Sequence, residues 1–193
     1  MKKIGIIIKP FISIIFGALL FLVCLNYLSL KDTALAIGIV GVVLAAYYLA
    51  VGIIGIILGD KLGKQLKKIL DLISIVLFPA FMFTIFLIAT INGAKAEALL
   101  PTGWVIYITS MTGAILMVVA YVLAAFLDNK LIARLGFLFS AIFVLALLLD
   151  VLFSAQGLPV VLGEIDVIKV VTYLVYTFML FNSFEKQEDK LAE

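Results

Sequence analysis

The sequence contains no histidine, a single cysteine and few charged residues. Without histidine the chain lacks the commonest metal ligand and the commonest general base. That absence excludes histidine-ligated haem, histidine-type zinc sites and a Ser-His-Asp triad. The lone cysteine, Cys24, excludes an intrachain disulfide and a cysteine-ligated metal cluster. We therefore expect no enzymatic activity, no metal and no cofactor.

Charged residues make up only 13% of the 193 residues, whereas 66% are apolar. The mean hydropathy is +1.33. A chain of this size cannot enclose so much apolar surface in a water-soluble core, so we predict an integral membrane protein in contact with the lipid bilayer. The net charge is only +2, without a basic arm, which leaves nucleic-acid binding without an electrostatic basis. Lysine outnumbers arginine 13 to 1, which favours a bacterial cytoplasmic membrane as the location.

Six apolar segments have the length of about 20 residues that a helix needs to cross the hydrocarbon core. They are residues 10–30, 33–59, 70–91, 104–127, 131–153 and 160–184. The first segment is longer than the apolar region of a cleaved signal peptide, so we interpret it as a retained span. The expected fold is an all-α, polytopic bundle of six transmembrane helices that forms one domain over residues 1–193.

The distribution of basic residues predicts the orientation of these spans. With the N-terminus inside, 11 of the 14 lysine and arginine residues fall on the cytoplasmic side, as the positive-inside rule requires. Very short links at 31–32 and 128–130 are typical of antiparallel neighbours. We expect three consecutive hairpins with cytoplasmic N- and C-termini. Their charged exits resemble one another, which indicates either an internal repeat or only the usual basic inner loops.

The linker at residues 60–71 has two interpretations. Its apolar residues fall at helical spacing between lysines, which is typical of a basic amphipathic helix on the inner leaflet. A simple cytoplasmic extension of the second and third spans explains the same pattern.

Small residues recur along the second span with a period of about 3.5 residues, as in a close-packed helix face. Tyr48 fills the one gap in this seam, and a looser version in the fourth span suggests that the two faces pack on each other. The seam is either a packing face inside one bundle or an interface for a homo-oligomer or membrane partner. Its members are Ala34, Gly38, Gly41, Ala45, Gly52, Gly55 and Gly59.

Four charged residues at the ends of the fifth and sixth spans form the candidate site: Asp150, Glu164, Asp166 and Lys169. Lys169 is unusual because it lies at the outer edge, where positive charge is disfavoured. Asp166 shares its helix face, and we expect Lys169 to pair with Asp150 or Asp166. The cluster is either a salt bridge that fastens two helices or an outward-facing solute, ion or proton site. Three acids against one base would favour cations.

The first hairpin resembles the HdeD-type short-repeat membrane proteins. The likeness is carried by Phe16-Gly17-Ala18-Leu19-Leu20, by Ile37-Gly38-Ile39-Val40-Gly41 and by Gly52-Ile53-Ile54-Gly55. Pro79 and the charged sixth segment have no counterpart in that pattern. The resemblance implies a stress-related membrane protein. We therefore expect a non-enzymatic accessory or interaction role in envelope stress, immunity or assembly, with a small transporter or channel subunit as the alternative.

Overall fold

The computed structural model describes residues 2–28, 32–97, 99–127, 129–154 and 167–192. These residues form six α-helices and one 3-10 turn, which confirms the all-α prediction. The helices are α1 (Lys2–Leu28), α2 (Asp32–Leu58), α3 (Lys64–Lys95), α4 (Pro101–Leu127), α5 (Lys130–Ser154) and α6 (Val167–Ala192), and the turn η1 (Gly59–Lys61) follows α2.

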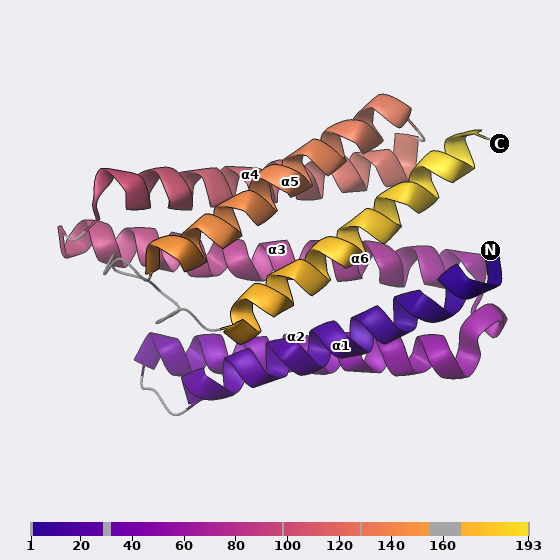
Figure 1. Ribbon diagram of the computed structural model, residues 1–193, viewed down its shortest axis with the longest axis horizontal. Coiled ribbons are helices and arrows are strands. Elements are labelled where there is room, and N and C mark those ends of the chain that lie inside the picture. The colour runs from indigo at the N-terminus through magenta and orange to yellow at the C-terminus, as the bar shows by residue number, and fades with distance from the viewer. Residues whose placement is uncertain (1, 29–31, 98, 128, 155–166, 193) are drawn as a thin grey trace.

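The helices alternate in direction along one long axis, so both termini lie at the same end of the bundle (Figure 1). We call this the terminal end and the opposite one the distal end. Helix α1 packs along α2, α4 packs along α5, and α6 crosses the bundle in contact with α1 and α5. The α3–α4 and α5–α6 pairs are less extensively packed than these two pairs. The bundle is therefore not built from three equivalent hairpins.

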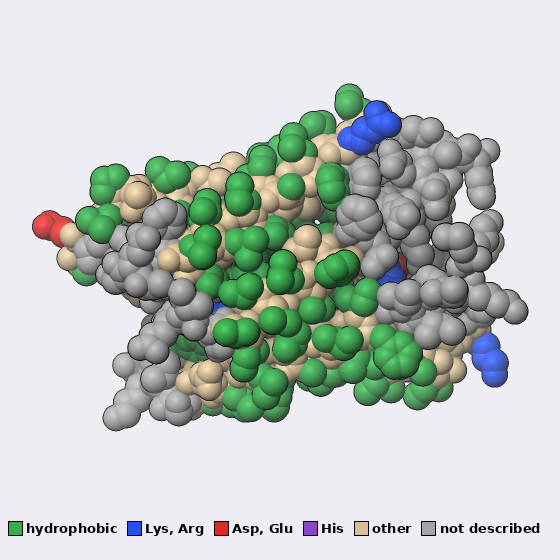
Figure 2. Space-filling view, viewed as in Figure 1, with side chains coloured by type: hydrophobic (Ala, Val, Ile, Leu, Met, Phe, Trp, Pro, Cys, Tyr) green, Lys and Arg blue, Asp and Glu red, His purple; other side chains and the backbone are tan. Residues whose placement is uncertain are grey.

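Apolar side chains cover the bundle surface, and Figure 2 shows charged ones near its two ends. Helices α1 to α5 each contain a stretch long and apolar enough to cross a membrane. The described apolar part of α6, Val167–Leu180, is shorter. A surface of this kind is stable only in a lipid environment, so the chain is a multi-pass membrane protein.

Two helices extend further than the predicted spans. Helix α1 begins at Lys2 and contains Pro10, the residue expected to start the first span. Helix α3 begins at Lys64, so most of the 60–71 linker continues the third span instead of forming a separate surface helix. The Lys68 Nζ atom donates to the carbonyl of Ala125, 2.6 Å away, and thereby ties this extension to the end of α4. A cation is favourable there because carbonyls at a helix C-terminus lack helical partners.

The small-residue seam of α2 packs against α1. A Cβ atom built on Gly52 would lie 2.5 Å from Ile14 Cγ1 and 2.8 Å from the Pro10 carbonyl oxygen. A Cβ atom on Gly17, on the α1 side, would lie 2.9 Å from the Ala45 carbonyl oxygen. Only glycine permits such close backbone approach, which is how helices gain van der Waals contact in lipid.

Two details of the predicted seam are wrong. Gly59 does not belong to it, because α2 ends at Leu58 and Gly59 turns the chain at a φ of +39° with nothing within 4 Å of its Cβ position. The small face of α4 packs on α5 instead of α2: a Cβ atom on Gly113 would lie 3.3 Å from Phe143 Cα. Each small face therefore meets its sequence neighbour.

Candidate functional site

Two of the four predicted site residues are described, and both are buried. Asp150 lies in the last turns of α5 with 4% of its surface exposed, and Lys169 lies in the first turn of α6 with 5% exposed. The opposite charges of Asp150 and Lys169 interact electrostatically. Glu164 and Asp166 lie outside the described residues. The choice between Asp150 and Asp166 as the partner of Lys169 therefore stays a prediction.

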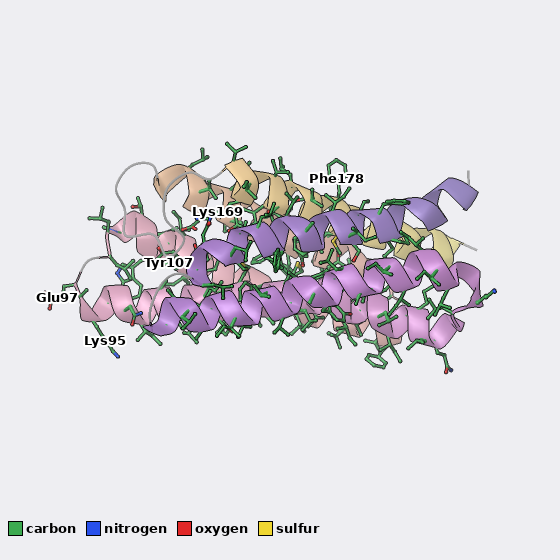
Figure 3. The ribbon with its side chains drawn as sticks, turned by 90° about the horizontal axis from the view of Figure 1, so that it is seen from below. Lys95, Glu97, Tyr107, Lys169 and Phe178 are labelled. Carbon is green, nitrogen blue, oxygen red and sulfur yellow. The ribbon has the colours of Figure 1, made fainter. Side chains whose placement is uncertain are left out.

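Three tyrosines surround this distal pair, which we define as Asp150 and Lys169. Tyr107 of α4 and Tyr173 of α6 are buried and lie within electrostatic range of the Asp150 carboxylate. Tyr27, at the end of α1, is buried and interacts electrostatically with Tyr173. Figure 3 shows Tyr107 and Lys169 in the distal half, deeper than the exposed Lys95 and Glu97 at its tip. The phenolic groups give the pair a polar surrounding inside an otherwise apolar bundle.

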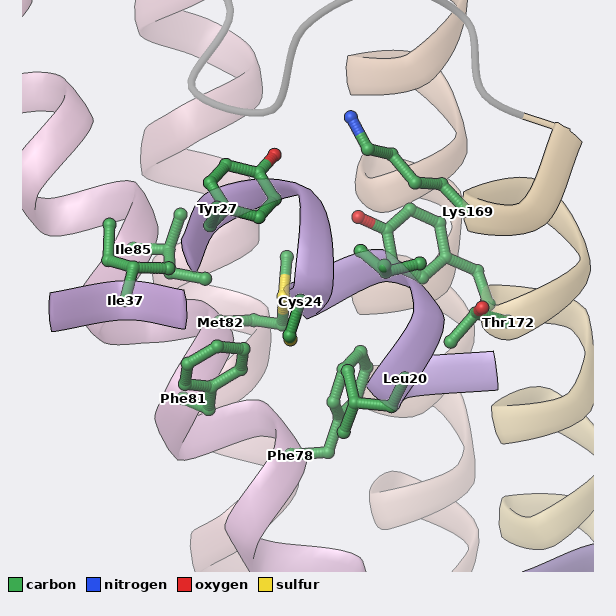
Figure 4. A pocket seen from close by; sticks show the side chains of 12 residues that line it. Leu20, Cys24, Tyr27, Ile37, Phe78, Phe81, Met82, Ile85, Lys169 and Thr172 are labelled. Carbon is green, nitrogen blue, oxygen red and sulfur yellow. The ribbon is translucent and has the colours of Figure 1, made fainter. Parts of the chain in front are cut away.

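A small cavity of about 20 Å³ lies beside Lys169. It is enclosed by α1, α2, α3 and α6, and Figure 4 shows Tyr27 and Lys169 at its distal edge. Cys24 and Phe78 line its deeper part. The cavity has room for about one water molecule and no larger solute, but its wall is almost entirely apolar and Asp150 does not line it.

A second charged pair joins α1 and α3 near the terminal end. Lys9 Nζ lies 2.6 Å from Asp71 Oδ2, and we call these two residues the terminal pair. The side chains are 20% and 33% exposed, but the Lys9 Nζ atom itself is enclosed. The sequence analysis missed this pair, because a charge at the end of a span is ordinary by itself and the two residues are far apart in the chain.

Polar side chains between the first three helices continue inward from the terminal pair. The Ser13 hydroxyl donates to the Tyr48 carbonyl at 3.0 Å, and the Tyr48 hydroxyl donates to the Ser74 carbonyl. Tyr47 reaches the Leu70 carbonyl and the Ser74 hydroxyl, each at 3.3 Å. Buried polar groups inside a membrane protein need such partners, because lipid offers none.

An aromatic layer separates the two charged pairs. Phe16 of α1 packs edge-on against Phe78 of α3, with ring centroids 5.1 Å apart, and Tyr176 of α6 lies 4.5 Å from Phe78. These three rings are less than 2% exposed. From the terminal end, α1 and α3 each carry the same series: first a charged residue, then a serine, then an aromatic ring, and finally residues that line the cavity beside Lys169. The bundle thus carries two polar regions with a closed apolar layer between them.

Comparison with protein-family models, with curated proteins and with solved structures finds no match to this chain. The resemblance to HdeD-type proteins therefore stays a prediction.

Proposed function

We propose that this chain is a small transporter or channel subunit with a site for protons or small cations at the distal pair. The observation that carries the proposal is the burial of Asp150 and Lys169 inside a membrane bundle, with Lys169 in the wall of a cavity of about 20 Å³. Ionisable residues in membrane spans are costly and typically mark an ion or proton pathway. The acids Glu164 and Asp166 nearby in the sequence make the region negative on balance, which favours cations.

In the proposed mechanism, the contact between Asp150 and Lys169 can be replaced by a contact between Asp150 and a proton or cation. A proton or cation that reaches the Asp150 carboxylate competes with Lys169 for it and weakens the link between α5 and α6. The aromatic layer of Phe16, Phe78 and Tyr176 acts as the barrier that this movement must open. Alternating access needs a polar region on each side of a barrier, and this bundle has both.

The proposal includes the membrane topology. We infer that the sixth span predicted at residues 160–184 includes the described apolar part of α6, and that the terminal end faces the cytoplasm of a bacterium. Support comes from the basic residues of the terminal end, which follow the positive-inside rule: Lys9, Lys61, Lys67, Lys68 and Arg134. A reporter fused after Glu193 that is active only in the cytoplasm agrees with this orientation, and a reporter active only outside contradicts it.

A flux measurement tests the transport function. The purified protein is reconstituted in liposomes that contain a pH-sensitive or cation-sensitive dye, and flux is driven by a potassium diffusion potential. We expect flux in the wild type, loss of flux in Asp150→Asn, and unchanged flux in the matched control Glu97→Gln, whose carboxylate is exposed at the distal tip. Equal flux in the wild type and Asp150→Asn would contradict the site.

The second candidate is the non-enzymatic accessory or interaction role, and the closed aromatic layer favours it. In that case the distal pair only fastens α5 to α6, and wild-type liposomes show no flux of protons or monovalent cations. The seam of α2 gives this role no free interface, because Gly38, Gly41 and Gly52 face α1. A partner would contact the exposed face of α2 instead, which includes Val43 and Ile57.

A further inference from the structure

A cavity larger than the one beside Lys169 lies at the terminal end, away from the distal pair. Its volume is about 70 Å³, and it opens between α1, α2, α3 and α6. Its polar wall consists of Lys9, Ser13, Lys67, Asp71 and Ser74, and its apolar wall includes Ile54, Leu62 and Leu70. The cavity therefore combines charged donors with an apolar surface at the depth where a membrane span ends.

Local sequence explains why this space stays open. Pro10 lies directly against α2, and a Cβ atom on Gly55 would lie 3.0 Å from its Cγ atom. Pro10 and Gly55 both line the cavity. Gly59, at the turn after α2, has no side chain and nothing within 4 Å of its Cβ position, so it leaves the cavity wall unfilled.

The donors of the cavity outnumber its acceptors. Lys9 Nζ is enclosed and lies 2.6 Å from Asp71 Oδ2, and no second acceptor among the described residues contacts it. An ammonium group carries three N–H donors, so an enclosed one with a single carboxylate contact leaves donors unpaired, which is unfavourable. Lys67 lines the same cavity, so two ammonium groups and one carboxylate leave one positive charge in excess. The serine hydroxyls already donate to backbone carbonyls, at 3.0 Å for Ser13 and 2.8 Å for Ser74.

We propose that this cavity binds an anionic phosphate group, with Lys9 and Lys67 as its donors. Phosphate oxygens supply several strong acceptors, and charge-assisted bonds to ammonium groups are stronger than neutral ones. The apolar wall of Ile54, Leu62 and Leu70 favours the headgroup of an anionic phospholipid over free phosphate, because an acyl chain can follow it. Phosphate binding in this cavity does not depend on the proposed transport function. Only the assignment of the cavity to the cytoplasmic leaflet rests on the proposed topology.

Thermal unfolding in detergent tests the proposal with three probes. Phosphatidylglycerol, phosphatidylcholine or inorganic phosphate is titrated into the purified full chain, and the rise in melting temperature gives an apparent Kd. We expect phosphatidylglycerol to stabilise the wild type and phosphatidylcholine, whose headgroup has no net charge, to stabilise it much less. A rise with inorganic phosphate alone supports the phosphate chemistry and identifies free phosphate as the source.

Three variants locate the binding. Lys67→Gln removes one donor and should raise the apparent Kd for phosphatidylglycerol about tenfold, the equivalent of one charge-assisted contact. The double variant Lys9→Met/Asp71→Asn removes the terminal pair without a change in net charge, and it should weaken binding as well. Lys95→Gln, at the exposed distal tip, is the matched control and should bind as the wild type does. Equal binding by all variants would overturn the proposal. So would a wild type in which inorganic phosphate has no effect and phosphatidylglycerol stabilises no more than phosphatidylcholine does.

Discussion

The distal and terminal pairs place opposite charges at the two ends of one bundle, but in different surroundings. Asp150 and Lys169 are at most 5% exposed, whereas the side chains of Lys9 and Asp71 are 20% and 33% exposed. A buried charge that loses its partner has no solvent to replace it, whereas the Asp71 carboxylate, on a side chain that is 33% exposed, does. This difference indicates that burial, and not the mere presence of charge in a span, decides how strongly each pair stabilises the fold.

Removal of Lys169 should have the largest effect on stability. Lys169→Met leaves the Asp150 carboxylate uncompensated inside the bundle, which should lower the free energy of unfolding by about 3–5 kcal/mol. Additional neutralisation by Asp150→Asn should recover part of this loss. A double-mutant cycle measured by chemical unfolding in detergent micelles checks both expectations. If the double variant is no more stable than Lys169→Met, the two side chains are not coupled.

A larger side chain in the small-residue seam of α2, beside the terminal cavity, should have a smaller effect on stability. Gly52→Leu places new atoms where Ile14 and the Pro10 carbonyl already lie, and such overpacking costs about 1–3 kcal/mol. Ile53→Leu, next in the chain, changes an exposed side chain and serves as the control with an expected change near zero. Melting temperatures in detergent separate the two variants. Equal stability would remove the close approach of α1 and α2 from the explanation of the fold.

The smallest effect is expected at the terminal pair. Lys9→Met should reduce the free energy of unfolding by only about 0.2–1 kcal/mol, because the Asp71 side chain left behind is 33% exposed. Asp71→Asn keeps an oxygen that can accept from the enclosed Lys9 ammonium, so it should be similarly mild, and both effects should be compared with Lys169→Met under the same conditions. A loss at Lys9 as large as that at Lys169 would erase the difference between the two pairs. Unfolding curves for the three variants in one detergent decide this.

The sequence predicted that Lys169 pairs with Asp150 or Asp166, because charges that interrupt or border long apolar runs stand out. The terminal pair could not be predicted in the same way. Lys9 and Asp71 lie at the ends of different spans, where charges are normal, and only the packing of α1 against α3 brings them together. The tyrosines around Asp150 were missed for a related reason: Tyr27 and Tyr107 belong to helices whose mutual positions depend on tertiary packing.

Local patterns predicted the helices better than their partners. The small-residue period located the packing face of α2 correctly at Gly38, Gly41 and Gly52. The same period was extended too far at Gly59, because a turn glycine and a packing glycine are identical in a periodic count. The contact between the small faces of α2 and α4 was also wrong. Close packing needs only a complementary neighbour. For α2 that neighbour is α1, and for α4 it is α5.

The central claim is that the distal pair serves ion movement and does not merely fasten α5 to α6. Flux and unfolding measured together on the double variant Asp150→Asn/Lys169→Met test this claim most directly. The variant carries no unpaired charge at the distal pair, so it should fold with most of the wild-type stability. Our account predicts proton or cation flux in wild-type liposomes and its loss in the folded double variant. Undiminished flux in that variant, or no flux in a folded wild type, would contradict it.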